Sequence, residues 1–176
     1  MLDEQLPIVY LSILLVLLAI AGYLIFSQVL KVSKTEGKIS KLENKLKNEK
    51  GTSLEYYELG RLYLEKKLYT QSGKLFQKAL KVGNIEPENK ALIYNGLGYS
   101  YFANEQYDLA IRQYKEALDN NPEYVIALNN LAFAYERKKL LGSAIETYEE
   151  TLKYDPENAT AKRRLETLRK RFVSSS

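Results

Sequence analysis

Few side chains in this sequence could carry covalent chemistry. The sequence has no cysteine and no histidine, so a thiolate nucleophile, an imidazole base and a Cys/His zinc site are excluded. Carboxylate pairs, Ser–Lys dyads and oxygen ligands for Mg²⁺ or Ca²⁺ remain, but there is no Gly-rich phosphate loop, GxSxG or DxDxDG motif. The aromatic residues are 15 tyrosines and 5 phenylalanines, and such rings suit non-covalent recognition. We therefore expect a binding protein, not an enzyme, with no metal and no cofactor.

A recurring pattern of small and large residues indicates which elements hold these rings. Tyr-x2-Leu-Gly-x2-Tyr occurs at 56–63 and 94–101, and residues 128–135 read Leu-x2-Leu-Ala-x2-Tyr. The small residue of each copy precedes a second small residue, at Ser72, Ala110 and Ala144 respectively. The second and third copies are 34 residues apart, whereas the first and second are 38 apart, so four residues are inserted around 83–88. Three copies of one pattern predict three stacked helix pairs.

This pattern resembles the tetratricopeptide repeat (TPR) superfamily. The resemblance implies an all-α fold, with a right-handed superhelix of three helix pairs over residues 53–156 (repeats at about 53–90, 91–124 and 125–158). Pro122 and Pro156 should end the second helix of each of the last two pairs. Residues 157–176 should form a capping helix and a basic tail. The apolar face of that helix comprises Ala161, Leu165, Leu168 and Phe172.

In a stack of this kind the first helices of the pairs line a concave groove, so residues one turn away from the packing positions should face a partner. The predicted partner-binding residues are aromatic, amide or cationic side chains: Tyr57, Arg61, Asn95, Tyr99, Phe102, Asn129, Phe133 and Arg137. Leu54, Leu64, Leu92 and Ile126 complete the lining. Such a face suits a peptide, with rings as anchors, Asn side chains as polar clamps, and Arg61 and Arg137 selecting acidic residues at the rim.

One subset of the superfamily grips acidic chaperone tails through a Lys/Asn/Asn/Lys/Arg clamp. The equivalent positions here hold Tyr57, Arg61, Gly96, Ile126 and Asn130, so the clamp is missing. We therefore do not expect a chaperone-tail adaptor.

A long uncharged segment precedes the repeats. Residues 8–30 are 23 residues dense in Leu, Ile and Val, and they would span about 35 Å as a helix, enough to cross a bilayer core of about 30 Å. Residues 1–30 are therefore predicted to be a transmembrane anchor. A cleaved signal peptide is the alternative, since Ala19-Ile20-Ala21 resembles a cleavage site. An acidic start and continuation of the apolar run past that site oppose cleavage.

The segment 31–52 is a lysine-rich stalk that we expect to be helical up to Gly51. Its net charge is +4, from seven lysines and three glutamates, whereas no lysine or arginine precedes the apolar run. The positive-inside rule places the repeats on the cytoplasmic side, or on the stromal side in a plastid. The stalk is either a solvated spacer or a contact for anionic lipid through Lys31, Lys34, Lys38 and Lys41, and both can hold.

Over its full length the chain resembles the membrane-anchored TPR proteins of cyanobacteria and algal plastids that are implicated in photosystem I assembly. The resemblance lies in the order of the parts, the total length and the Lys-rich stalk. It implies a thylakoid location, single-pass anchoring and photosystem I subunits or assembly factors as partners. The alternative is a bacterial inner-membrane TPR adaptor for envelope or secretion complexes. We expect no nucleic-acid partner, because the repeats at 53–156 hold 15 acidic and 13 basic side chains.

Overall fold

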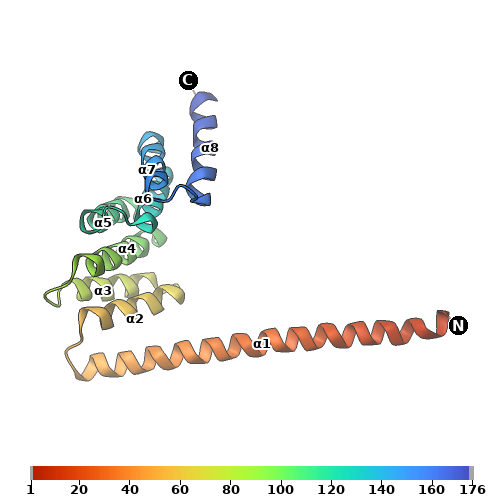
Figure 1. Cartoon of the computed structure of the whole chain (residues 1–176). Coiled ribbons are helices and arrows are strands. Elements are labelled where there is room, and N and C mark those ends of the chain that lie inside the picture. The colour runs from red at the N-terminus through yellow and green to blue at the C-terminus, as the bar shows by residue number, and fades with distance from the viewer. Residues whose placement is uncertain (1, 175–176) are drawn as a thin grey trace. The chain divides into compact units, whose positions relative to one another are not determined.

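The computed structural model describes the backbone of residues 2–174 and the side chains of residues 9–170, and every regular element in this part of the chain is a helix (Figure 1). It forms two compact units, residues 1–45 and residues 46–176, and each is described by itself. The helices are α1 (Leu2–Asn48), α2 (Ser53–Glu65), α3 (Tyr69–Leu80), α4 (Pro87–Ala103), α5 (Tyr107–Asn120), α6 (Val125–Arg137), α7 (Leu141–Tyr154) and α8 (Ala159–Ser174).

Helix α1 is a single helix of 47 residues that joins the expected anchor to most of the expected stalk. No proline follows Pro7 in α1, and Leu, Lys and Glu are good helix formers, so nothing interrupts the helix between the apolar run and Asn48. Large apolar side chains from Val9 to Leu30 are half or more exposed, as for Leu17 at 58%. Among the described residues, α1 is the one helix long and apolar enough to cross a membrane.

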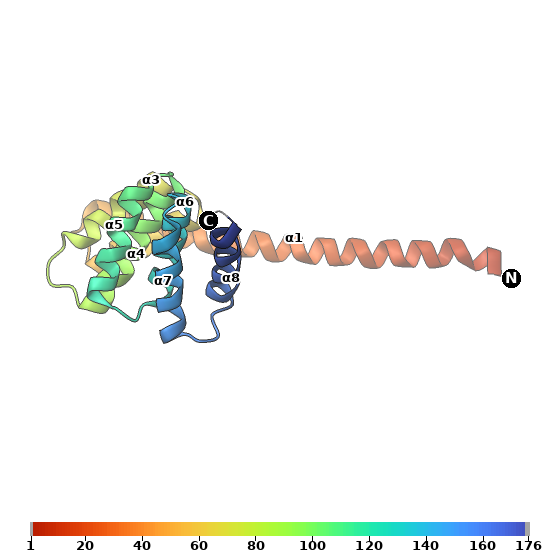
Figure 2. The same ribbon diagram turned by 90° about the horizontal axis from the view of Figure 1, so that it is seen from above.

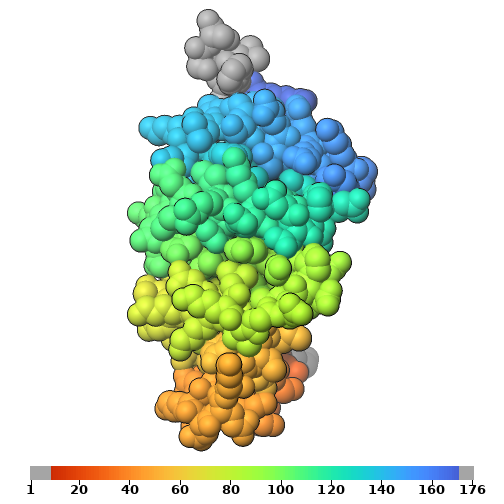
Figure 3. Space-filling view, turned by 90° about the vertical axis from the view of Figure 1, so that its left-hand side faces the viewer, coloured from red at the N-terminus to blue at the C-terminus, as the bar shows by residue number. Residues whose placement is uncertain are grey.

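The repeats are three helix pairs, α2–α3, α4–α5 and α6–α7, with α8 packed on the last (Figures 1 and 2). We call the first helix of each pair the A helix and the second the B helix. Each helix packs on its neighbours along the chain, and the pairs form successive layers, from orange for the first to blue for the last in Figure 3. The all-helical superhelix of three pairs predicted from the pattern is confirmed.

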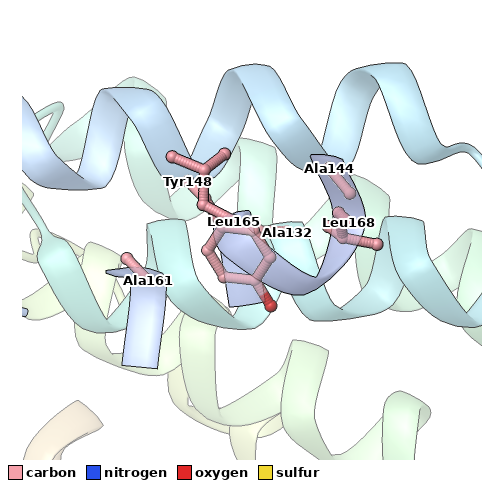
Figure 4. Close-up of a cluster of buried hydrophobic side chains, with 6 residues drawn as sticks. All are labelled: Ala132, Ala144, Tyr148, Ala161, Leu165 and Leu168. Atoms are coloured by element: carbon pink, nitrogen blue, oxygen red, sulfur yellow. The ribbon is translucent and has the colours of Figure 1, made fainter. Parts of the chain in front are cut away.

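Each pair is closed by the same packing of a small residue against a ring. The small residue on the A helix and the ring on the B helix are 16 residues apart in every pair: Gly60 and Phe76, Gly98 and Tyr114, Ala132 and Tyr148. A Cβ atom added at Gly98 would lie 2.6 Å from the Tyr114 ring, and one at Gly60 would lie 2.8 Å from Phe76. The rings are at most 1% exposed, so the small residue is what lets the helices meet. Figure 4 shows the Ala132–Tyr148 pair within its cluster.

The three turns between A and B helices share one backbone conformation. Lys67, Glu105 and Lys139 have φ values of 59°, 60° and 60°, in the left-handed region. In each turn the following N–H donates to the carbonyl five residues back, as from Gln106 to Tyr101 at 2.9 Å. This is the 6→1 hydrogen bond of a Schellman cap. The residue with the left-handed conformation in such a cap is usually glycine. Three identical caps give the pairs the same internal geometry.

The connections between pairs differ, and the four-residue insertion lies in the first. α5 ends before Pro122 and α7 before Pro156, as expected. After α3, a longer connection is followed by Pro87 at the first turn of α4, which has 17 residues against 13 in α6. The insertion therefore adds a turn to α4 besides lengthening the loop. At the other end, α8 buries Ala161, Leu165 and Leu168, whereas the side chain of Phe172 lies outside the described residues.

Candidate partner-binding face

The predicted partner-binding residues lie on the A helices α2, α4 and α6, and we call the surface they form the A-helix face. Tyr99 and Arg137 are exposed, and the others are half-buried. Two apolar side chains of the predicted lining are also exposed, Leu54 at 54% and Ile126 at 56%, and the exposed fraction of Tyr99 is 42%. This face therefore combines exposed apolar side chains with aromatic rings. Such a combination is typical of a protein-binding surface.

An aromatic row lies on the part of the face nearer the C-terminus. The ring centroids of Phe102 and Phe133 are 5.4 Å apart, and Phe102 is equally close to Tyr107, at 5.4 Å. A guanidinium lies over each end of the row: that of Arg137 is 5.3 Å from the Tyr107 centroid, and that of Arg164 is 4.8 Å from the Phe133 centroid. We call these five side chains the cation–aromatic row. It joins residues from α4, α5, α6 and α8.

The two predicted amide clamps are engaged between repeats. Asn95 Nδ2 donates to the Tyr124 hydroxyl at 3.4 Å, and Asn95 Oδ1 accepts from Asn130 Nδ2 at 2.9 Å. Asn129 Nδ2 donates to Asn158 Oδ1 at 3.3 Å, which repeats the Asn95–Tyr124 relation one pair further on. Asn129 Oδ1 is buried and accepts no hydrogen bond from the described residues. These amides therefore join neighbouring repeats, whatever else they bind.

The first repeat presents a different surface. The Tyr57 ring packs on Phe76 with centroids 5.8 Å apart, and burial raises the pKa of its phenol. Arg61 Nε donates to Glu58 Oε2 at 3.0 Å, Nη2 donates to Glu58 Oε1 at 2.8 Å, and Nη1 reaches Glu65. The hydrogen bonding that Arg61 donates to Glu58 is the largest cause that raises the pKa of Arg61, which stays charged. Its donors are therefore turned toward its own helix.

Two buried tyrosines lie in the cores of the second and third repeats. Tyr148 donates its hydroxyl to Glu136 Oε1 at 2.7 Å, and Arg164 Nε lies 3.6 Å from the same oxygen. Burial, together with the bond to Glu136, raises the pKa of Tyr148 strongly. Burial also raises the pKa of Tyr114, whose ring lies beneath Gly98. Both phenols are therefore uncharged near neutral pH.

Five residues of this surface lie outside the predicted set: Tyr107, Tyr124, Asn130, Asn158 and Arg164. The sequence pattern indicates only one face of each A helix. Tyr107 begins α5, Tyr124 precedes α6 and Arg164 belongs to α8, so that pattern does not include them. Asn130 follows Asn129 directly, on the side of α6 that meets Asn95. The 34-residue period offered one signal, since Asn129 and Asn158 repeat the spacing of Asn95 and Tyr124. Among the described residues, no group of three or more acidic side chains could hold a metal.

Two tetratricopeptide repeat family models match the chain, at residues 52–123 and 95–159. The uncharacterized protein ycf37 of Cyanophora paradoxa is 41% identical over 113 residues, 64% of this chain and 65% of that protein. The ycf37 protein of Guillardia theta is 34% identical over 124 residues, 70% of each chain. The chloroplastic tetratricopeptide repeat domain-containing protein PYG7 of Arabidopsis thaliana is 32% identical over 68% of this chain, which is 40% of its own length.

Solved structures share the fold. MamA superposes with a TM-score of 0.72 at 22% identity over 78% of each chain. The first TPR domain of Spaghetti (RPAP3), solved with an HSP90 peptide, superposes with a TM-score of 0.64 at 21% identity, over 69% of this chain and 93% of its own. At these identities the likeness concerns the fold alone. Repeats, family models and relatives agree: the chain belongs to the tetratricopeptide repeat family, and its relatives there include the ycf37 proteins.

Proposed function

We propose that this chain is a non-enzymatic scaffold that holds protein segments on its A-helix face. The observation that carries the proposal is the cation–aromatic row, where two phenylalanines lie between two guanidiniums. Exposed Tyr99 and Ile126 extend the apolar surface on the same helices. Aromatic and arginine side chains are the commonest energetic anchors of protein interfaces. The backbone and the buried core stabilise the fold of the repeats. The exposed side chains of the face can therefore contact a partner.

The proposal places α1 in a membrane as a single-pass anchor. Its apolar side chains from Val9 to Leu30 are exposed throughout, which in water would be a large unfavourable apolar surface. Lysines begin at Lys31, directly after the apolar run, so the repeats lie on the stromal or cytoplasmic side. Lys31, Lys34, Lys38 and Lys41 are all exposed, and each contributes about 1 kcal/mol of attraction near anionic headgroups.

The partners that we propose are photosystem I subunits or their assembly factors in the thylakoid membrane. The full-length resemblance to photosystem I assembly proteins supports this, as do the ycf37 relatives and the chloroplastic relative. A scaffold confined to the same membrane as its partners meets them at a high effective concentration. Modest affinity of the A-helix face therefore suffices, and no turnover is needed.

Paired tyrosine variants test the role of the face. Tyr99 and Tyr154 are 42% and 43% exposed, but Tyr99 lies on the A-helix face and Tyr154 ends the B helix α7. In a strain that lacks the gene, photosystem I should be depleted on native gels of thylakoid membranes. Tyr154→Ala should restore it, whereas Tyr99→Ala combined with Phe133→Ala should not. Unchanged photosystem I in the deletion strain would refute the photosystem assignment, and full rescue by the folded double variant would refute the face.

Protease protection tests the orientation. Isolated thylakoids expose the stromal surface, so added protease should remove the repeats and leave a protected fragment that contains α1. Inside-out vesicles from the same membranes should protect the repeats. The reverse pattern would show that the lysines after Leu30 do not set the topology.

A further inference from the structure

The cation–aromatic row presents two guanidiniums that differ from the other arginine of the face. Arg137 rests over Tyr107, and its Nη2 donates to the Tyr107 hydroxyl at 2.7 Å. Among the described residues no carboxylate pairs with Arg137, although its neighbour Lys138 pairs with Asp108 at 2.9 Å. Arg137 is exposed, so its charge faces solvent while Tyr107 holds its guanidinium in place. It is therefore a positioned cation that forms no ion pair within the described residues.

Arg164 is positioned at the other end of the row. Its guanidinium lies 4.8 Å from the Phe133 centroid, and its Nε is 3.6 Å from Glu136 Oε1. The same oxygen accepts the Tyr148 hydroxyl at 2.7 Å, and the Glu136 side chain is 12% exposed. Glu136 is thus largely covered, and its Oε1 lies nearest the Nε edge of Arg164. This 3.6 Å approach is longer than a hydrogen bond, so within the described part of the chain Glu136 holds Arg164 only loosely.

We propose that the row binds an acidic segment of a partner protein in which an apolar side chain is flanked by carboxylates. The inference rests on the proposed function and specifies its partner. The apolar side chain would pack on Phe102 and Phe133, and the carboxylates would accept bidentate hydrogen bonds from Arg137 and Arg164. Both arginines are specificity-determining residues. The acid–apolar–acid order of the segment follows from the cation–ring–cation order of the row.

The first repeat supplies an internal control. Arg61 is hydrogen-bonded to Glu58 and faces Glu65, so two carboxylates of its own helix already occupy its donors. A partner's carboxylate would have to displace them and would meet their negative charge. Selection for acidic segments is therefore assigned to Arg137 and Arg164, and not to Arg61.

Short synthetic peptides test this inference on the full-length protein in detergent micelles. One fluorescein-labelled peptide carries Glu-Phe-Glu between Gly-Ser flanks, and matched peptides carry Gln-Phe-Gln or Glu-Ser-Glu. Fluorescence polarisation should show binding of the Glu-Phe-Glu peptide at least about tenfold tighter than that of either matched peptide. Added salt should weaken it. Arg137→Gln and Arg164→Gln should each reduce the affinity about tenfold, and Arg61→Gln should leave it within about twofold.

Folding controls accompany these variants, because Arg164 also contacts Phe133 and Glu136. Circular dichroism melts should be close to that of the unchanged protein, and Arg164→Lys should retain part of the affinity. Equal binding of the Gln-Phe-Gln peptide, no binding of the Glu-Phe-Glu peptide up to about 1 mM, or an equal loss in Arg61→Gln would overturn the inference. Failure here with loss of photosystem I in Tyr99→Ala, Phe133→Ala would leave the scaffold function intact. Charge-selective binding with unaffected photosystem I would refute only the assigned partner.

Discussion

The first and third repeats use an arginine of the A-helix face in opposite ways. Arg61 lies between Glu58 and Glu65 of its own helix, whereas Arg137 lies on the Tyr107 ring and pairs with no carboxylate of the described residues. The core ring also differs, since Phe76 in the first repeat is replaced by Tyr114 and Tyr148 in the later ones. The helix pairs nevertheless close in the same way, with a small residue beneath a ring. The packing that defines the fold therefore leaves the chemistry of each repeat's surface free to vary.

The largest expected effect comes from breaking the second pair at its closest approach. Gly98→Leu should lower the free energy of unfolding by about 3 kcal/mol or more, because a Cβ there would already lie 2.6 Å from the buried Tyr114 ring. Gly142→Leu is the matched control, since a Cβ at Gly142 in α7 would meet nothing within 4 Å. Urea unfolding of the full chain in micelles, followed by circular dichroism, measures both. Equal stability of the two variants would contradict the assigned packing.

The second prediction concerns how the stability of the later repeats depends on pH. Burial raises the pKa of Tyr114 and Tyr148 above that of an unfolded tyrosine, so the folded state keeps both phenols protonated. Their contribution is complete below pH about 10, and stability then falls as pH rises, by at most about 1.4 kcal/mol per pH unit for each phenol. The first repeat has Phe76 at this core position, although burial also raises the pKa of its Tyr57.

Phenylalanine variants test directly whether these two phenols cause the loss of stability at alkaline pH. Tyr114→Phe combined with Tyr148→Phe should flatten the loss of stability between about pH 10 and pH 12, and Tyr154→Phe, at an exposed tyrosine, should not. Thermal melts across this range measure the slope. An unchanged slope in the double variant would mean that alkaline unfolding has another cause.

These comparisons also show what the sequence could predict. The helix pairs followed from the repeated spacing of Gly60, Gly98 and Ala132, because close packing demands a small residue at each of these positions. The residues of the cation–aromatic row were predicted only in part. Phe102, Phe133 and Arg137 lie at the predicted phase of their A helices, but Tyr107 and Arg164 reach the row from α5 and α8. Contacts between elements depend on the superhelical arrangement, which a single-helix pattern does not contain.

The left-handed turns were not predicted for a related reason. Lys67, Glu105 and Lys139 occupy a conformation usually marked by glycine, and none of the three residue types indicates it. At Leu30 the sequence changes from apolar to charged residues, and this change suggested a boundary between anchor and stalk. Both kinds of residue favour a helix, so α1 continues past Leu30 to Asn48.

A third, smaller effect is expected from the amides that join the repeats. Asn95→Ala removes the partner of both Asn130 and Tyr124, and it should lower the free energy of unfolding by about 1 kcal/mol. Asn84→Ala, at an exposed position in the connection after α3, is the control and should change little. Urea unfolding measures both. If Asn95→Ala proves neutral but weakens partner binding, the amide acts as the polar clamp that the sequence predicted.

The smallest effect tests the first repeat's arginine itself. Arg61→Gln should lower the free energy of unfolding by less than about 1 kcal/mol, because the ion pairs are largely exposed and screened by solvent. The loss should shrink at high salt, where both the pairs and the repulsion between the remaining glutamates are weakened. Arg137→Gln has no carboxylate pair to lose among the described residues, so its small effect on stability should not depend on salt. Thermal melts at low and high salt compare the two. If both variants respond to salt alike, Arg61 is no more committed to its own helix than Arg137, and the first repeat becomes a second acid-selecting surface.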